Sequence, residues 1–254
     1  MISIYLPILT NLIIFALAGW VVSLATKNVT HVDSMWSIFF VLAMATGMFQ
    51  LSTITDKHAA IMIVLLIWAS RLSIYLTLRN WGQPEDIRYQ HIRENNSPGF
   101  HIKSLYIIFL LQALLAAIIV LPLISSLLNT QPYNSIDIIG LGIVLFGILF
   151  QTIADIQLKH FLSKDKDKGI LDKGLWKYSR HPNYFGECLI WWGFYIASQG
   201  SGPWFTILSP ILMTVLLLKV SGVGLMEQTI TSRRPGYTEY IKKTSSFIPW
   251  PPKN

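Results

Sequence analysis

The chain has 254 residues, of which 52% are hydrophobic and 13% are charged, and its mean hydropathy is +0.49. Soluble domains carry about 25% charged residues, so this composition excludes an ordinary soluble protein and favours an integral membrane protein. The formal net charge is +7, and the single cysteine rules out an intrachain disulfide and a cysteine-based zinc cluster. That residue, Cys188, lies in an apolar block and is interpreted as a packing residue.

Seven apolar blocks of about the length of a membrane-spanning helix follow one another along the chain. They cover Ile4–Leu24, Met35–Leu51, Ala59–Leu78, Leu105–Leu128, Ile136–Gln157, Tyr184–Ser198, the shortest, and Trp204–Val223. No basic residue precedes the first block, which we expect to be a retained helix rather than a signal peptide. The sequence therefore predicts an all-α polytopic membrane protein with seven transmembrane helices and a cytoplasmic C-terminal interfacial helix, in a single domain over residues 1–254.

The basic residues lie almost entirely on one side of this arrangement. With loops on alternating sides, 19 of the 20 Lys and Arg residues fall on the side that holds the carboxyl terminus, and Lys57 alone falls on the other. The positive-inside rule then predicts an amino terminus outside and a carboxyl terminus in the cytoplasm. The basic face could attract anionic lipid headgroups or receive a polyanionic cofactor. Nucleic acid is not expected, because the basic residues flank the spans and form no separate module, and no protein partner is indicated.

Ionisable side chains at membrane depth are costly and therefore mark candidate functional positions. In chain order the first are Asp33 at the start of span two and Arg71 near the cytoplasmic end of span three, with Tyr75 one turn further on. A helix cap would also explain Asp33, snorkelling would explain Arg71, and interfacial anchoring would explain Tyr75. These alternatives stay open for all three residues.

Span five carries a second polar set. Asp155 follows Gln151 by four residues, so both side chains lie on the same helix face. The carboxylate could form a structural ion pair or accept hydrogen bonds from a ribose or an amide. Gly140, Gly142 and Gly147 precede this pair on the same span, and small residues of this kind allow helices to approach closely in lipid.

The most informative segment is Ser179–Glu187, where a polar loop runs into the sixth apolar block. Its polar and ionisable members are Arg180, His181, Asn183, Tyr184 and Glu187. Capping and the helix dipole would explain Asn183 and Glu187 without any catalytic role. The concentration of such groups instead favours a cofactor pocket, and backbone N–H groups at the helix start could also hold a phosphate.

The carboxyl-terminal segment and several absent motifs complete the pattern. Tyr237 and Tyr240 could each donate a hydrogen bond, and the segment Phe247–Pro252 suits an interfacial anchor. The sequence contains no G-x-G-x-x-G, no G-K-[ST] loop and no H-E-x-x-H. Neither a Rossmann nor a Walker phosphate site is therefore available, and no metal site is supported.

The segment Trp176–Glu187 resembles the signature of a bacterial family of uncharacterised membrane proteins related to the carboxyl-terminal domain of steroid 5-alpha-reductases. Three other stretches fit this resemblance: Arg71-Leu72-Ser73-x-Tyr75, Glu85-Asp86-x-Arg88-Tyr89, and Pro235-Gly236-Tyr237-x-x-Tyr240 with Phe247–Pro252. Together they touch most of the chain from span three onward. Arg180-His181-Pro182-x-Tyr184 alone is less specific, because isoprenylcysteine carboxyl methyltransferases and sterol reductases resemble it there.

The resemblance implies an NADPH-dependent reductase of an activated carbon–carbon double bond in a lipophilic, steroid-like or isoprenoid-like substrate. It implies that Asn183 and Glu187 bind the nicotinamide end, with Asp155, Gln151, Tyr237 and Tyr240 also on the cofactor. His181 and Tyr184 belong to the same signature, and Arg71, Arg88 and Arg180 would clamp phosphates.

The substrate side departs from the steroid reductases. Their Gln-Glu pair on the second helix is missing, and Trp68 falls near the position of their substrate tyrosine. Asp33 and Tyr75 are the nearest candidates to polarise the substrate carbonyl. Two alternatives remain: a lipid-directed methyltransferase that uses S-adenosylmethionine, and a non-catalytic transport or scaffold protein. Against the methyltransferase, the tail carries Glu227-Gln228 in place of paired glutamates.

Overall fold

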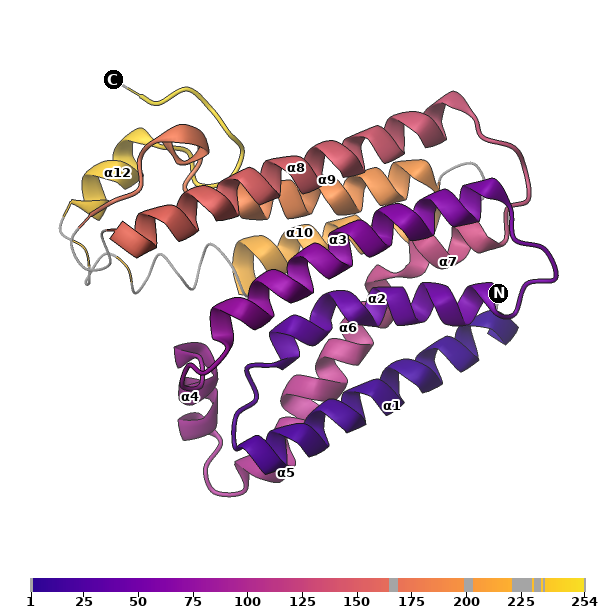
Figure 1. The fold of residues 1–254 in the computed structure, drawn as a ribbon, viewed down its shortest axis with the longest axis horizontal. Coiled ribbons are helices and arrows are strands. Elements are labelled where there is room, and N and C mark those ends of the chain that lie inside the picture. Colours follow the sequence, from indigo (N-terminus) through magenta and orange to yellow (C-terminus); the bar gives the residue numbers. More distant parts are fainter. Residues whose placement is uncertain are drawn as a thin grey trace. The chain divides into compact units, whose positions relative to one another are not determined.

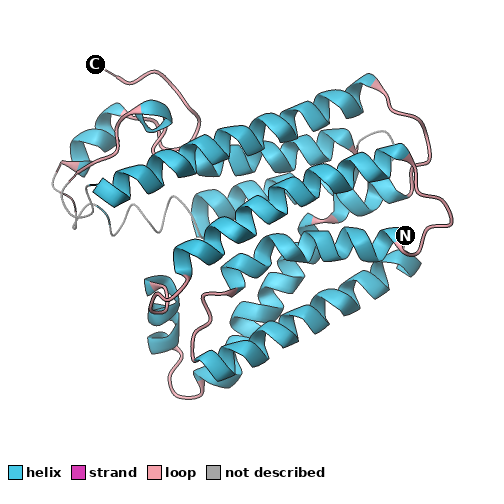
Figure 2. Cartoon of the chain, in the orientation of Figure 1, coloured by secondary structure: helices cyan, strands magenta, loops and turns pink. Residues whose placement is uncertain are grey.

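A computed structural model describes residues 2–164, 169–198, 203–220, 230, 234 and 236–253 (Figures 1 and 2). The described residues form helices, turns and loops, and no strand occurs among them. They divide into two compact units, Met1–Tyr133 with Gly200–Thr206, and Asn134–Gln199 with Ile207–Asn254. Each unit is described by itself.

The first unit is built from long apolar helices joined by short polar segments. Its helices are α1 (Ile2–Thr26), α2 (Val32–Met48), α3 (Asp56–Asn80), α4 (Ile87–Asn95), α5 (Phe100–Ser104), a π-helical segment (Leu105–Leu110), α6 (Leu111–Ile119) and α7 (Leu121–Leu127). The run from Phe100 to Ile119 is continuous, and Pro122 follows the break that ends it. Proline has no N–H to donate and clashes with the preceding turn, so the helix does not continue straight through this position.

The core of the first unit lies between α2 and its neighbours α1 and α3. Successive side chains of α2 point to different neighbours, because Phe39 contacts Phe15 of α1 edge to face and Phe40 contacts Trp68 of α3. Phe39, Phe40 and Trp68 are fully buried. The Ser37 hydroxyl also donates to the Ala69 carbonyl of α3 at 2.9 Å, which satisfies a buried polar group within the apolar packing.

The second unit is built around one helix pair. Its helices are α8 (Ser135–Lys164), a 3-10 turn (Gly174–Lys177), α9 (Pro182–Ala197), α10 (Leu208–Val215) after the 3-10 turn Trp204–Ile207, a π-helical segment (Leu216–Val220) and α12 (Tyr237–Lys243). The α8 and α9 helices lie side by side and antiparallel in Figure 1.

Glycines bring the backbones of α8 and α9 together. A Cβ at Gly140 would lie 2.3 Å from the backbone nitrogen of Ala197, and one at Gly147 would lie 2.9 Å from the Gly186 carbonyl oxygen. Gly193 and Gly186 on α9 face α8 equally closely, at Gly140 and Gln151. Close backbone approach is the expected result of small residues on facing helices. Gly142, predicted with the others, has open space around it and takes no part in this contact.

Within the part of the chain that the structure describes, four helices are long and apolar enough to cross a membrane: Ser3–Thr26, Asp56–Asn80, Phe100–Ile119 and Ser135–Lys164. Two shorter apolar helices, Val32–Met48 and Trp204–Lys219, correspond to the second and seventh predicted blocks. The fourth block differs most from its prediction, because its helix starts earlier, after Gly99 in a left-handed conformation (φ +84°), and breaks after Ile119. The all-helical class and the membrane-protein character are confirmed.

Candidate functional site

Glu187 is the centre of a buried polar cluster on the α8–α9 pair. Its Oε2 accepts a hydrogen bond from Gln151 Nε2 at 2.9 Å, and its Oε1 accepts one from the indole Nε1 of Trp191 at 3.0 Å. Glu187 and Gln151 are each 5% exposed and Trp191 is fully buried. Donors on both oxygens fix the orientation of the carboxyl group. The short distance between the two helices is what allows Gln151 to reach it.

A second polar pair lies one turn from the first along the same two helices. The Asn183 side chain donates from Nδ2 to Asp155 Oδ1 at 3.3 Å, and Asp155 is 4% exposed. Asn183 Oδ1 is buried, and among the described residues no donor lies within hydrogen-bond distance of it. A buried carbonyl oxygen without a donor is costly unless something else satisfies it. The pair thus offers an acceptor directed away from Asp155.

The start of α9 differs from the expected cap. His181 is the N-cap residue and makes no side-chain capping hydrogen bond, while Pro182 occupies the first helical turn. Asn183 is therefore inside the helix, and capping does not explain it. The ring of His181 lies parallel to that of Tyr184, with centroids 5.5 Å apart. His181 is only 5% exposed, so its imidazole is buried at the start of α9.

Arg180 and Ser179 hold the carboxyl-terminal segment. Arg180 Nη1 donates to the carbonyls of Ile241 at 3.0 Å and Thr244 at 2.6 Å, at the carboxyl end of α12. The Ser179 hydroxyl donates to the Phe247 carbonyl at 2.8 Å. An arginine at a helix carboxyl end satisfies carbonyls that lack helical partners and matches the helix dipole. Part of the Arg180 guanidinium is thus engaged in a contact that the sequence did not predict.

The two tail tyrosines are buried in the same region. Tyr237 and Tyr240 pack edge to face, with ring centroids 5.5 Å apart. The Tyr240 hydroxyl donates to the Trp176 carbonyl, in the 3-10 turn before α9. Trp176 in turn donates from its indole nitrogen to the Ala154 carbonyl of α8 at 3.1 Å. Tyr240 therefore helps to tie α12 to the turn that leads into α9.

In the first unit, Asp33 and Arg88 bind each other. Arg88 Nη2 lies 2.7 Å from Asp33 Oδ2, and Arg88 Nε lies 2.9 Å from Asp86 Oδ1. The Tyr89 hydroxyl donates to Asp33 Oδ1 at 2.6 Å. Burial opposes the charge of Arg88, but Asp33 and Asp86 outweigh it and raise its pKa above the usual value. Burial, with the Asp33 charge, raises the pKa of the Tyr89 hydroxyl well above its usual value. Asp33 makes no cap hydrogen bond, because His31 is the N-cap residue of α2.

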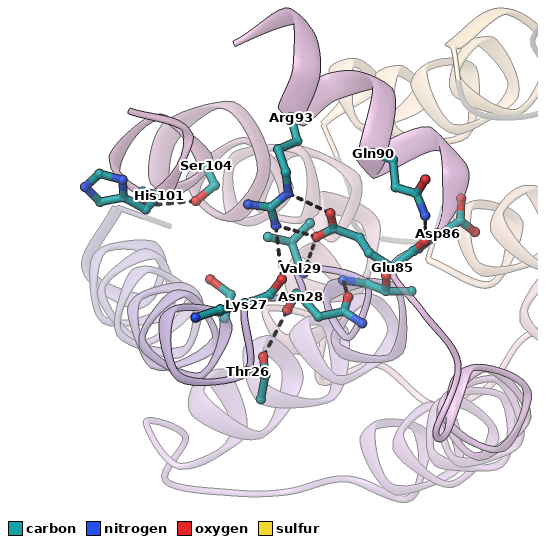
Figure 3. Close-up of polar contacts among 12 residues, drawn as sticks. Thr26, Lys27, Asn28, Val29, Glu85, Asp86, Gln90, Arg93, His101 and Ser104 are labelled. Atoms are coloured by element: carbon teal, nitrogen blue, oxygen red, sulfur yellow. Dashed lines mark hydrogen bonds and ion pairs between the residues drawn. The ribbon is translucent and has the colours of Figure 1, made fainter. Parts of the chain in front are cut away.

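A second ion pair stands beside this network and joins the α1–α2 turn to α4 (Figure 3). Arg93 lies 2.7 Å from Glu85 Oε1 through Nη2 and donates from Nε to Oε2 at 2.8 Å, while the Val29 backbone N–H donates to Glu85 Oε1 at 3.0 Å. Arg93 also donates to the Lys27 carbonyl at 3.2 Å. Burial opposes ionisation of Glu85, yet the hydrogen bonds from Arg93 and Val29 hold its pKa below the usual value.

The remaining candidates of the first unit lie on α3. The Arg71 guanidinium stands over the Tyr75 ring, 5.5 Å from its centroid, in a cation–π contact. Trp68, one turn earlier, is fully buried against Phe40 and is a core residue. The spacing of Arg71 and Tyr75 on one helix face explains their contact.

The predicted site residues fall into two groups. Asp33, Arg71, Tyr75 and Arg88 belong to the first unit, and the others belong to the second. Within the second unit the structure brings together Gln151 with Glu187 and Asp155 with Asn183. Sequence reasoning missed Trp191, although its position four residues after Glu187 places it on the same helix face. Pro235 and the pair Glu227-Gln228 lie outside the described residues.

This all-helical chain, with four helices able to cross a membrane and buried carboxylates between two of its helices, defines a polytopic membrane protein. It belongs to the family described as protein of unknown function DUF1295, which matches residues 19–244. An uncharacterised protein of the fission yeast Schizosaccharomyces pombe is 27% identical over 282 residues, covering 96% of this chain and 80% of its relative. No solved structure matches the chain.

Proposed function

We propose that this protein is a membrane-embedded NADPH-dependent reductase of an activated carbon–carbon double bond, related to the steroid 5-alpha-reductases. The observation that carries the proposal is the polar lining of the α8–α9 pair, where buried Glu187, Gln151 and Asp155 lie beside the half-buried Asn183 in an otherwise apolar helix contact. Buried ionisable groups in a membrane protein mark functional sites. The Asn183 oxygen without a donor fits an amide or hydroxyl group of a dinucleotide.

In this proposal the chain positions the cofactor and polarises the substrate. When bound, NADPH would supply a hydride to the β-carbon of a lipophilic enone, and with a proton added at the α-carbon the products would be NADP⁺ and the saturated ketone. Glu187 and Asn183 orient the nicotinamide end, and Asp155 accepts from the ribose or an amide. Asp33 and Tyr75 are the predicted candidates for the carbonyl, and the Tyr75 hydroxyl is proposed as its donor, because both oxygens of Asp33 already accept from Arg88 and Tyr89. A donor of this kind lowers the cost of the developing negative charge.

The contacts of the three arginines that were predicted to bind phosphates change the roles that we propose for them. Arg88 is bound to two carboxylates, and Arg180 contacts two carbonyls of the carboxyl-terminal segment. An arginine already paired in this way has fewer free donors for a phosphate. Arg88 and Arg180 therefore act chiefly by holding the structure, and Arg71, whose guanidinium stands over Tyr75, stays a proposed phosphate contact.

The proposal also includes the finer membrane arrangement. Seven helices cross a bacterial inner membrane with the amino terminus outside and the carboxyl terminus in the cytoplasm, because 19 of the 20 Lys and Arg residues then face the cytoplasm. The substrate reaches the site as a membrane-soluble molecule.

The test of the reaction is incubation of purified protein with lipid extracts and NADPH, followed by mass spectrometry. Products heavier by two hydrogens, formed with equimolar NADPH oxidation, are expected. S-adenosylmethionine is titrated in parallel. Binding of the methyl donor with none of NADPH would favour the methyltransferase, and binding of neither would favour a transport or scaffold protein.

A further inference from the structure

The carboxyl-terminal segment presents apolar side chains outward beside exposed lysines. Ile248 is 61% exposed and Trp250 is 68% exposed. The preceding residue, Phe247, is instead buried against Phe185 of α9, with ring centroids 5.9 Å apart. Exposed large apolar groups are unfavourable in water. Their outward position therefore needs an apolar or interfacial neighbour.

The lysines gather around these side chains through backbone contacts. The Lys253 N–H donates to the Lys243 carbonyl at 2.9 Å, which brings the end of the tail beside the end of α12. The Trp250 N–H donates to the Tyr178 carbonyl at 2.9 Å, and Lys177 Nζ lies 5.9 Å from the centroid of the Tyr178 ring. Lys177, Lys243 and Lys253 are exposed. Among the described residues, no acidic side chain lies within ion-pair distance of these three lysines.

From this juxtaposition we infer that Ile248, Trp250, Lys177, Lys243 and Lys253 form a docking surface for an anionic phospholipid bilayer. Tryptophan is favoured at the headgroup level, where one part of the ring is apolar and the N–H is wet. Each lysine near an anionic leaflet adds attraction that a zwitterionic leaflet does not supply. The surface thus commits to lipid, because its charge complements phospholipid and its apolar groups match the acyl boundary.

Docking at this surface would also steady the candidate site. The same tail segment is fixed to the start of α9 by Ser179 and Arg180, and Figure 1 shows α12 next to the turn that precedes α9. Asn183 lies about one helical turn, and Glu187 about two turns, after those two residues. A bilayer that holds the tail therefore limits the motion of the segment that carries both residues.

The test measures how fast a thiol at position 248 reacts in full-length protein. Ile248→Cys in a Cys188→Ser background supplies one exposed thiol, since the native cysteine is buried. The protein is placed in nanodiscs of phosphatidylcholine alone or of phosphatidylcholine with phosphatidylglycerol, and labelled with a membrane-impermeant maleimide. We expect labelling to be roughly tenfold slower in the anionic nanodiscs, with the difference lost in high salt.

Two lysine variants separate this surface from a general charge effect. Lys243→Gln with Lys253→Gln should remove the difference between the two lipid compositions, whereas Lys27→Gln, an exposed lysine in the first unit, should preserve it. Equal labelling rates in both compositions, or equal loss in the Lys27→Gln control, would overturn the inference. Protection in lipid-free detergent that grows with protein concentration would show that a second copy covers the surface, and would overturn it too.

Discussion

Glu187 and Glu85 show how the same residue type is held in two settings. Glu187 lies between apolar helices and accepts from an amide and an indole, whereas Glu85 lies at a loop and binds a partly exposed arginine. A buried carboxylate that loses a donor retains its desolvation cost without compensation. The two sites therefore predict different responses to substitution.

Replacing Trp191 with phenylalanine removes the indole donor and keeps an apolar ring. We expect Trp191→Phe to destabilise the protein by about 2 kcal/mol, because the hydrogen bond serves a charged group. Trp192→Phe is the matched control, since its indole donates to the neutral Thr214 hydroxyl at 3.3 Å. Thermal unfolding in detergent should show the larger loss for Trp191→Phe, and equal losses would contradict a charged, anchored Glu187.

The Glu85–Arg93 pair predicts a pH dependence. The folded-state pKa of Glu85 is lowered from the ordinary 4.5, so its contribution is present above that pH and is lost as the pH falls through the folded-state value. Glu85→Gln should lower the free energy of unfolding by about 1 kcal/mol at pH 7, a value that already allows for the solvent exposure of Arg93. Near pH 3 the loss should be much smaller. The melting-temperature difference between the two proteins measures this, and a constant difference from pH 7 to pH 3 would count against the ion pair.

Several residue roles could be predicted from sequence and others could not. The pairing of Gln151 and Asp155 with residues of the sixth block follows from their common helix face, and Trp191 follows from its spacing to Glu187. Arg180 could not be predicted, because its carbonyl partners lie 61 and 64 residues further along the chain. Asp33 and Arg88 each looked available for a ligand, yet they are 55 residues apart and bind one another.

At the scale of elements, the α8–α9 contact depends on glycine spacing. Gly140 and Gly147 are seven residues apart and share a helix face, whereas Gly142 points elsewhere. The sequence identified all three as packing residues, and only the geometry of the pair separates them. The two kinds of glycine are therefore predicted to differ in how alanine at each position changes stability.

Alanine at the two kinds of glycine should change stability in opposite directions. Gly140→Ala places a methyl group 2.3 Å from the Ala197 backbone nitrogen and should destabilise by about 1–3 kcal/mol. Gly142→Ala meets open space and should stabilise α8 by up to about 1 kcal/mol, because alanine is the better helix former. Melting temperatures that fall for both variants would show that α8 and α9 do not meet in this register.

At the scale of the whole molecule, hydropathy and charge predicted the class of protein but not the first and last residue of each helix. Four apolar blocks became helices long enough to span. The second and sixth blocks form helices of 17 and 16 residues, which begin three and two residues before the predicted starts, directly after the α1–α2 turn and at Pro182. Composition reports the apolar content of a block, and such turns decide where the helix within it begins.

The orientation is tested by thiol accessibility in intact cells. In a Cys188→Ser background, Gln131→Cys should react with an impermeant maleimide from outside, because the proposed arrangement puts the segment before α8 on the side almost free of lysine and arginine. Lys253→Cys should react only after permeabilisation. The reverse pattern would place the carboxyl terminus outside and would contradict the binding of a cofactor from the cytoplasm.

The most direct measurement is NADPH titration of the purified protein in detergent, with Asn183→Ala, Glu187→Ala and Thr152→Ala beside the wild type. Thr152 neighbours Gln151, and among the described residues its side chain bonds within its own helix alone, to the Ile148 carbonyl at 2.6 Å, so it is the matched control. We expect saturable binding by the wild type and Thr152→Ala, and at least roughly tenfold weaker binding by the other two, which corresponds to one lost charge-assisted hydrogen bond. No binding by the wild type, or equal binding by all four proteins, would contradict a dinucleotide site between α8 and α9.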